Sequence, residues 1–275
     1  MPANVIQGAD CDAFVTKTLD ERLQGCANWP SKFLPEQWSV YKPLLLRLAE
    51  REIPFAVGGA LAAMTYADQW RNTKDLDLYV LHQDVERIIP FLDDAGLVDY
   101  YDELAYDRRW IYRGHRRDST GGEIIVDLIW AMANQRAQVE ESWFQGPQVE
   151  AGGVRFRLLG PEMAVWSKLY VLQHDRSDWP DCFNVLNGVG PEMDWSRLIS
   201  STGDDLALLA GLVSVFSWLS PARARELPEC IWPALKLSPP AESGDVHLIA
   251  RRAALLDSRP WFFPVPENEY QPSNK

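Results

Sequence analysis

Two aspartates lie two residues apart inside an apolar run, "DLDLYV" (75–80), and this feature restricts the fold more than any other. Carboxylates are poor strand formers, and side chains two apart in a strand share a face, about 6.5 Å apart along the chain. Leu76 and Leu78 then point to the opposite face, which we expect to contact the core. Asp75 and Asp77 repel each other unless a cation lies between them. The run therefore predicts a strand with one core face and one acidic face.

A Gly-Gly step lies ahead of this strand, at the end of the apolar run "IPFAVGG" (53–59). The helical pattern "ALAAMTYADQW" (60–70) follows it, so Gly58 and Gly59 occupy a strand-to-helix turn. Glycine lets the backbone come close to a ligand, and the N–H groups at a helix start attract phosphate oxygens. The step is therefore a candidate phosphate-binding turn.

A third acid, Asp127, lies in the middle of the apolar run "IIVDLIW" (124–130). An unpaired ionised carboxylate is costly to bury in such a strand. Three acids that converge from neighbouring strands form an oxygen-rich site suited to hard divalent cations such as Mg²⁺ (or Mn²⁺). Two such ions about 3.5–4 Å apart can hold a triphosphate and activate an attacking hydroxyl. We therefore predict that Asp75, Asp77 and Asp127 share a divalent-ion site.

The order of predicted elements indicates an α/β (α+β) fold. Between 36 and 130 helices alternate with strands, and two strand-like runs, "RRWIYRG" and "EIIVDLIW", are predicted to form a hairpin around "DSTGG" (118–122). After a short strand in "VRFRLL", Pro161 begins a pattern that is helical to about residue 257. We predict a mixed sheet flanked by helices in a domain over 36–150, after an entry segment over 1–35, and a mostly helical domain over 151–275.

Charge and cysteine content exclude several classes of protein. The net charge of −12 disfavours adhesion to nucleic acid and to anionic membranes. The four cysteines have no regular spacing, which argues against a disulfide framework and a zinc site. The chain start has no signal-peptide pattern, and the apolar segment 206–219 is too short to span a bilayer. A cytoplasmic protein without a membrane partner is the prediction.

These motifs together resemble a known family. The chain is similar to small bacterial nucleotidyltransferase-like proteins of the superfamily that includes DNA polymerase beta, over roughly residues 40–190. The first part of the resemblance is the pattern "GG…R.TKDLDL", here Gly58, Gly59, Arg71, Thr73, Lys74, Asp75, Leu76, Asp77 and Leu78. The second is a "PE…K" helix with a following Arg-x-Asp segment, here Pro161, Glu162, Lys168, Arg176, Ser177, Asp178 and Asp181.

The resemblance implies a function and a role for each motif. The protein would move a nucleoside monophosphate, AMP from ATP in the first instance, from an NTP to a hydroxyl acceptor with Mg²⁺ (or Mn²⁺). Asp75 and Asp77 would bind both metals, and Asp127 would bind the catalytic metal and accept or orient the hydroxyl proton. The residues implied to bind the nucleotide are Gly58, Gly59, Arg71, Lys74, Lys168 and Arg176. A small, cationic acceptor suits the negative net charge.

The chain departs from the family pattern in two places, and alternatives stay open. Fifteen residues separate Gly59 from Asp75, which implies an added loop at "ADQW", and Ala60 stands where related polymerases carry serine. One alternative is an inactive member that binds a nucleotide or a partner, and another is a toxin-type enzyme acting on RNA or protein. The basic run "DRRWIYRGHRRD" (107–118) is either an anion contact or a solvated hairpin. Lys168 and Arg176 are either triphosphate ligands or helix-surface residues paired with Glu162 or Asp178.

Overall fold

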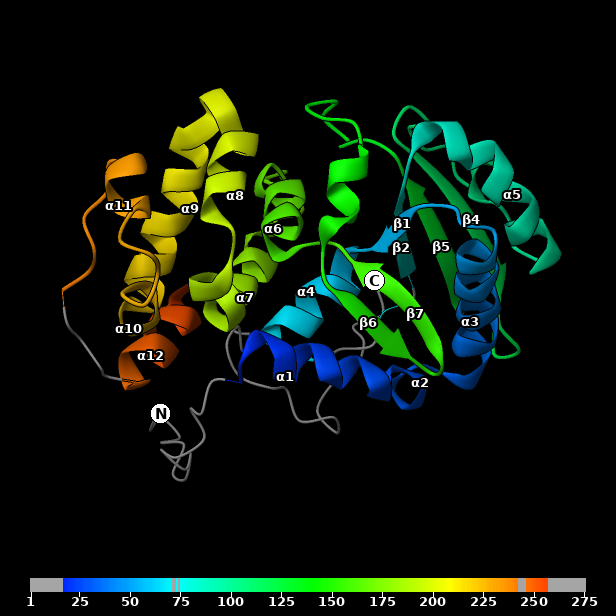
Figure 1. Ribbon diagram of the computed structural model, residues 1–275, viewed down its shortest axis with the longest axis horizontal. Helices are drawn as coiled ribbons and strands as arrows, with labels where there is room; N and C mark the ends of the chain where they lie inside the picture. Colours follow the sequence, from blue (N-terminus) through cyan, green and yellow to red (C-terminus); the bar gives the residue numbers. More distant parts are fainter. Residues whose placement is uncertain (1–16, 71–72, 74, 242–245, 257–275) are drawn as a thin grey trace, which may run out of the picture.

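Seven strands form one mixed sheet in the computed structural model, which describes residues 17–70, 73, 75–241 and 246–256 (Figure 1). Strand β2 runs parallel to β5 and β1 runs parallel to β7, whereas the other neighbouring pairs are antiparallel. The predicted α/β (α+β) class is confirmed. In sheet order the strands are β3 (Val98–Asp99), β4 (Ile111–Arg117), β5 (Glu123–Ile129), β2 (Asp75–Val80), β1 (Phe55–Val57), β7 (Val154–Leu158) and β6 (Gln148–Ala151).

Three helices of the first half, α3, α4 and α5, pack around this sheet. Helix α3 (Pro35–Glu50) begins with proline at its first position and buries an apolar stripe that includes Leu44, Leu45 and Leu48. It packs against β7 and against α5 (Val85–Asp94), after which Gly96 adopts a φ of 75°. Helix α4 (Gly59–Ala67) connects β1 to the segment that leads into β2. The helix predicted over 60–70 therefore forms, beginning one residue earlier and ending at Ala67.

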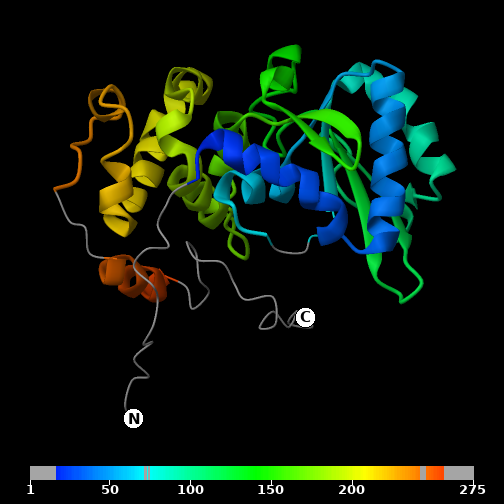
Figure 2. The same cartoon turned by 60° about the horizontal axis from the view of Figure 1, so that its bottom comes forward.

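The helical second half lies beside the sheet and is joined to it through α4 (Figure 1, Figure 2). Helix α4 packs against α6 and α7, and it also contacts α1 and β2. The remaining helices are α1 (Leu19–Gln24), α2 (Trp29–Lys32), α6 (Pro161–Leu169), α7 (Trp179–Val189), α8 (Trp195–Thr202), α9 (Leu206–Leu219), α10 (Pro221–Ala224), α11 (Ile231–Ala234) and α12 (Val246–Leu256). Short 3₁₀ turns cover Gly25–Asn28, His82–Asp84, Tyr100–Asp102, Glu141–Gln145, Gly190–Glu192 and Gly203–Asp205.

The sheet extends past the boundary that the sequence suggested between the two domains. Strands β6 and β7 form an antiparallel hairpin that crosses residues 150 and 151, and β7 pairs with β1. The sequence analysis placed the first of these two strands in no element and missed the two-residue strand β3. The division of the chain into two domains stays a prediction, and the pairing of β7 favours a boundary after Leu158.

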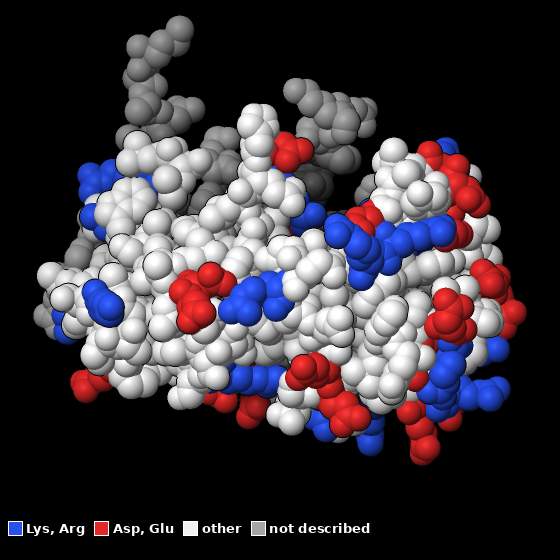
Figure 3. All heavy atoms as spheres, turned by 90° about the horizontal axis from the view of Figure 1, so that it is seen from above, with Lys and Arg blue, Asp and Glu red and all other residues white. Residues whose placement is uncertain are grey.

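Helix α9 and the surface near it bear on membrane contact. The helical run Trp195–Leu219, taken through the turn at Gly203–Asp205, is long and apolar enough by composition to cross a membrane, which is weak evidence because core helices pass the same test. Leu209, Leu212 and Phe216 of α9 are buried in the core. On the face in Figure 3, Lys and Arg lie in several separate groups, most of them with Asp or Glu beside them. A cytoplasmic location stays a prediction.

Candidate active site

The three predicted acids come together on one face of two adjacent strands. Asp75 and Asp77 of β2 are partly exposed, and the alternating Leu76 and Leu78 are buried on the opposite face. In the parallel pairing of β2 and β5, Asp77 is directly opposite Asp127. Directly opposite residues on paired strands point to the same side of a sheet. The late acid therefore faces the early pair.

The Gly-Gly step lies against the acidic strand. A Cβ atom on Gly59 would lie 1.5 Å from Oδ2 of Asp77, and Gly59 has a φ of 55°. The N–H of Gly58 donates a hydrogen bond to the carbonyl oxygen of Asp77 at 3.0 Å, and a Cβ there would lie 2.3 Å from the Tyr79 ring. Both glycines are therefore required by the close approach of the α4 start to β2.

We expect Gly59→Ala to destabilise the protein and displace the Asp77 carboxylate. The left-handed backbone costs an alanine about 1–2 kcal/mol, and the collision with Asp77 adds about 1–3 kcal/mol of overpacking. Gly153→Ala is the matched control, because Gly153 has a φ of 81° and open space around its Cα. Urea unfolding of the two variants measures the difference. Equal losses of stability would show that the contact with Asp77 contributes nothing.

Burial and mutual repulsion make the acidic face unfavourable for negative charge. The pKa of Asp77 is raised to about 7, first by burial and then by Asp127 and Asp75, while Lys168 and Arg113 oppose the rise. Burial likewise raises the pKa of Asp127 against the effect of Arg113. Positive charge placed between these carboxylates would favour their ionised forms. The face is therefore electrostatically prepared for a cation.

Arg113 is a site residue that the sequence analysis did not single out. From β4 it donates two hydrogen bonds to the buried Asp127, from Nε to Oδ1 at 2.8 Å and from Nη2 to Oδ2 at 2.6 Å. The signal was available in the hairpin turn: a turn centred on residue 120 pairs 113 with 127, as the structure does. Other arginines of the basic run pair locally, in the ion pairs Arg108–Asp99, Arg109–Asp107 and Arg117–Glu103. For these three, the solvated-hairpin interpretation fits the structure.

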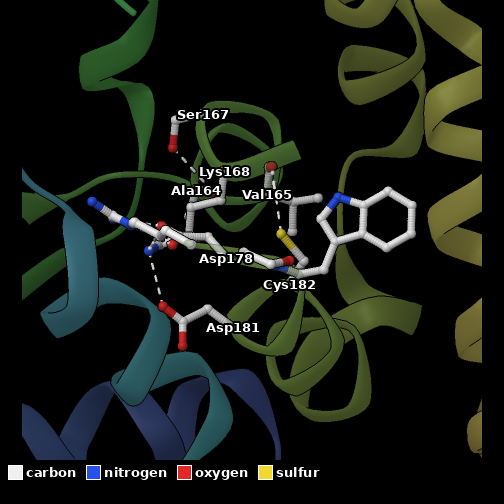
Figure 4. A network of polar contacts seen from close by, with 10 residues as sticks. Ala164, Val165, Ser167, Lys168, Asp178, Asp181 and Cys182 are labelled. Carbon is white, nitrogen blue, oxygen red and sulfur yellow. Dashed lines mark hydrogen bonds and ion pairs between the residues drawn. The ribbon is translucent and has the colours of Figure 1, made fainter. Parts of the chain in front are cut away.

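Lys168 lies at the junction between the sheet and the helical half (Figure 4). Its Nζ on α6 donates to Oδ2 of Asp178 and to Oδ2 of Asp181, both at 2.9 Å, and its side chain is 12% exposed. Arg176 donates to the same Asp178, at 2.8 Å from Nε and 2.9 Å from Nη2. Both cations also act on the acidic face, since Lys168 lowers the pKa of Asp77 and Asp77 raises that of Arg176.

The sequence analysis left open that Lys168 and Arg176 are helix-surface residues paired with Glu162 or Asp178. This alternative is correct in part. Asp178 is their partner, as the alternative held, but the Lys168 side chain is only 12% exposed, so it is not an ordinary helix-surface residue. Glu162, the other proposed partner, pairs with Arg197 at 3.0 Å instead. The remaining predicted nucleotide ligands, Arg71 and Lys74, lie outside the residues that the structure describes.

A cavity of about 330 Å³ lies away from the acidic face. Its lining comes from the end of α3, the start of β1, the Glu141–Gln145 turn and the β6–β7 hairpin, and includes Ile53, Phe55, Phe144 and Phe156. None of the three aspartates lines it. The candidate site is therefore defined by the convergence of charged side chains and glycines, and this cavity contributes nothing to it.

Comparison with known proteins agrees with this geometry. Residues 37–210, more than half of the chain, match the model of a family described as "Uncharacterised nucleotidyltransferase". The chain belongs to this family. The resemblance inferred from the sequence motifs is thereby confirmed, and this chain is a nucleotidyltransferase. No curated protein matches it significantly.

Solved structures with related descriptions are similar to this chain at low identity. An antigenic nucleotidyltransferase-like protein from Paracoccidioides brasiliensis is 19% identical, with a TM-score of 0.44 over 75% of this chain and 95% of that one. ANT(2")-Ia, solved in complex with adenylyl-2"-tobramycin, is 17% identical, with a TM-score of 0.42 over 65% and 97%. A protein from H. pylori described as a "putative nucleotidyltransferase" is 15% identical, with a TM-score of 0.40 over 81% of this chain and 97% of that one.

The donors on the acidic face of this nucleotidyltransferase fit a hard divalent cation. Asp75 and Asp77 offer carboxylate oxygens beside a turn whose missing Cβ atoms leave room for close approach. Each oxygen of Asp127 accepts one hydrogen bond from Arg113 through one lone pair, and each has a second lone pair left to bind a cation. In this conformation the three aspartates do not bring one oxygen each within 4.8 Å of one another. The side chains must therefore close inward to share an ion.

Proposed function

We propose that this nucleotidyltransferase moves a nucleoside monophosphate, AMP from ATP, to a hydroxyl group of a small molecule, with Mg²⁺ (or Mn²⁺) as cofactor. One observation carries the proposal: Asp75, Asp77 and Asp127 share one face of two adjacent strands, directly against Gly58-Gly59. Acidic strands beside a glycine turn are what a metal-bound triphosphate requires, because carboxylates hold the metal and backbone N–H groups approach the phosphates.

The metal would be held by Asp75 and Asp77, with Asp127 completing the set. When bound, it would neutralise the triphosphate and make the acceptor hydroxyl more acidic. Gly58 and Gly59 would admit phosphate oxygens to the start of α4. Lys168 would offer positive charge to the leaving phosphates from α6, and its electrostatic effect on Asp77 supports this role. Arg176 would do the same from the α6–α7 connection.

The transfer itself balances as a single displacement at phosphorus. The acceptor oxygen forms a bond to the α-phosphorus while the bond from that phosphorus to the bridging oxygen of pyrophosphate breaks. The hydroxyl proton passes to a carboxylate oxygen of Asp127, whose remaining lone pairs can accept it while Arg113 holds the side chain in place. Pyrophosphate leaves, and the acceptor carries the nucleoside monophosphate.

The acceptor is proposed to be small and to carry a positive charge. The net charge of −12 and the interleaved charges of the face in Figure 3 disfavour a nucleic acid. The negative net charge of the chain would attract a cationic molecule. A toxin-type substrate, RNA or protein, is the competing outcome of the test.

The test measures Mg²⁺-dependent nucleotide binding and transfer. We expect millimolar ATP with Mg²⁺ to raise the melting temperature of the wild type by several degrees, and the variant Asp75→Ala plus Asp77→Ala to show no rise. Asp93→Asn, an exposed acid on α5, is the control and keeps the full shift. Incubation with α-labelled ATP, Mg²⁺ and fractionated cell extract then identifies the acceptor. Label in RNA or protein would overturn the small-molecule acceptor, and the absence of any thermal shift in the wild type would overturn nucleotide binding.

A further inference from the structure

A histidine and two glutamates meet at the end of the β4–β5 hairpin, outside the acidic face described above. His115 comes from β4, Glu123 from the start of β5, and Glu103 from the residue after the Tyr100–Asp102 turn. One ligand atom from each lies within 4.8 Å of the other two. We propose that Glu103, His115 and Glu123 form a transition-metal site that binds Zn²⁺, distinct from the Mg²⁺ (or Mn²⁺) site proposed above.

The imidazole of His115 is the observation that points to a ligand. The residue is 3% exposed, and neither Nδ1 nor Nε2 has a hydrogen-bond partner. Nε2 lies 3.8 Å from Oε1 of Glu103, which is too long for a hydrogen bond. The ring of Tyr100 meets the imidazole edge-on at 4.7 Å and excludes water from that side. Burying an imidazole without a hydrogen-bond partner costs free energy, because its nitrogens lose their contacts with water. A cation bound to the nitrogen lone pair would compensate for this cost.

The donor set selects the class of metal. A neutral imidazole with two carboxylates suits Zn²⁺ and similar transition metals, whereas Mg²⁺ prefers oxygen ligands alone. Tetrahedral coordination at about 2.1 Å places ligand atoms roughly 3.4 Å apart, so the three side chains need only a small closure. Glu103 can supply it, because it lies on a turn and its side chain is 44% exposed. Arg117 now forms an ion pair with Glu103 at 3.5 Å. Zn²⁺ would take the place of Arg117 as the cationic partner of Glu103.

The strand register places this site next to the acidic face, on the same side of the β4–β5 hairpin but with different residues. His115 is opposite Ile125, and Arg113 is opposite Asp127, one step further along the same face of the hairpin. Tyr100 contacts both steps: its ring meets His115, and the Arg113 guanidinium lies 5.9 Å from its centre. Zn²⁺ would therefore fasten the Tyr100 turn over the pair of Arg113 and Asp127. This proposal does not depend on the proposed reaction.

The experiment titrates chelator-treated protein with Zn²⁺ by calorimetry and measures the retained zinc after dialysis. A Cys11→Ser plus Cys230→Ser background removes two competing thiols: Cys230, which is exposed, and Cys11, which lies outside the described residues. We expect one Zn²⁺ per chain, at least a tenfold weaker affinity in Glu103→Gln, and at least a hundredfold weaker affinity in His115→Gln. Co²⁺ as a spectroscopic probe should give visible absorption bands that disappear in the same variants.

Two controls make the result decisive. Asp75→Asn plus Asp77→Asn should leave Zn²⁺ affinity unchanged, which separates this site from the acidic face. Glu103→Gln alters a partly exposed side chain, so it tests the site even if His115→Gln does not fold. The proposal is overturned if the wild type binds no stoichiometric Zn²⁺, or if Glu103→Gln and Glu123→Gln both keep wild-type affinity. Loss of Zn²⁺ in the double aspartate variant would also overturn it.

Discussion

Asp77→Asn is expected to abolish nucleotidyl transfer while making the metal-free protein more stable. Charge stabilisation through a bound metal is worth several kcal/mol, and each 1.4 kcal/mol is a factor of ten in rate, so we expect a loss of about 10³-fold or more. Stability should rise because the change removes a carboxylate that burial, Asp127 and Asp75 all disfavour in its ionised form. Each kcal/mol regained would raise the melting temperature by about 2–4 °C.

The pH dependence of stability provides an independent check of the same prediction. The pKa of Asp77 rises from 3.8 to about 7 on folding, so the folded state favours the protonated carboxyl. Its ionised form therefore weakens the metal-free fold above pH 7, and this penalty disappears as the pH falls from about 7 toward 4. The gain in melting temperature from Asp77→Asn should be largest at pH 8 and smallest near pH 4, as measured by thermal unfolding in a chelating buffer.

Asp93→Asn removes an equal charge at an exposed position and serves as the control. It should change neither the transfer rate nor the stability by a measurable amount. A metal-free Asp77→Asn variant that melts below the wild type at pH 8 would contradict the electrostatic account of the acidic face. Retained transfer in that variant would contradict its role in catalysis.

Arg113→Met is expected to cause a large loss of stability. It leaves Asp127, which is 2% exposed, without the two hydrogen bonds that now satisfy its oxygens. Breaking a buried ion pair in this way costs about 3–5 kcal/mol. Urea unfolding at pH 8 measures the loss, because the orphaned carboxylate is then least able to escape by taking up a proton.

The double variant Arg113→Met plus Asp127→Asn separates lost pairing from lost packing. Removing both charges eliminates the uncompensated carboxylate, so we expect the double variant to recover most of the stability lost by Arg113→Met. Arg109→Met is the matched control, since Arg109 pairs with Asp107 on the surface and should cost under about 1 kcal/mol. Additive losses in the double variant would mean that the pair is not coupled.

The local elements of this chain were predictable because they depend on neighbouring residues. The alternation of Asp75, Leu76, Asp77 and Leu78 predicted the two faces of β2, and the turn at 118–122 predicted the hairpin of β4 and β5. Strands β3 and β6 were missed because they span two and four residues, too few to show a pattern. Their formation depends on partner strands, β4 and β7, that local sequence does not reveal.

The candidate site was predictable in its acids and glycines and incomplete in its cations. The sequence placed three aspartates and a Gly-Gly step in one site, and the register of β2 with β5 brings Asp77 opposite Asp127. It did not assign Arg113 to Asp127, nor did it place Lys168 in a buried network with Asp178 and Asp181. Long flexible side chains can reach many partners; the register of β4 with β5 selects the partner of Arg113, and the packing of α6 and α7 selects those of Lys168.

Sequence alone determined which strand carries an acidic face, where the glycine turn lies and to which family the motifs point. These follow from the order of residues along the chain, since side-chain alternation and turn chemistry act over a few positions. Tertiary structure decided which strands are neighbours, and therefore that Arg113 holds Asp127 and that His115 meets Glu103 and Glu123. Such meetings depend on sheet order and register, which arise only when distant segments pack against one another to bury their apolar faces.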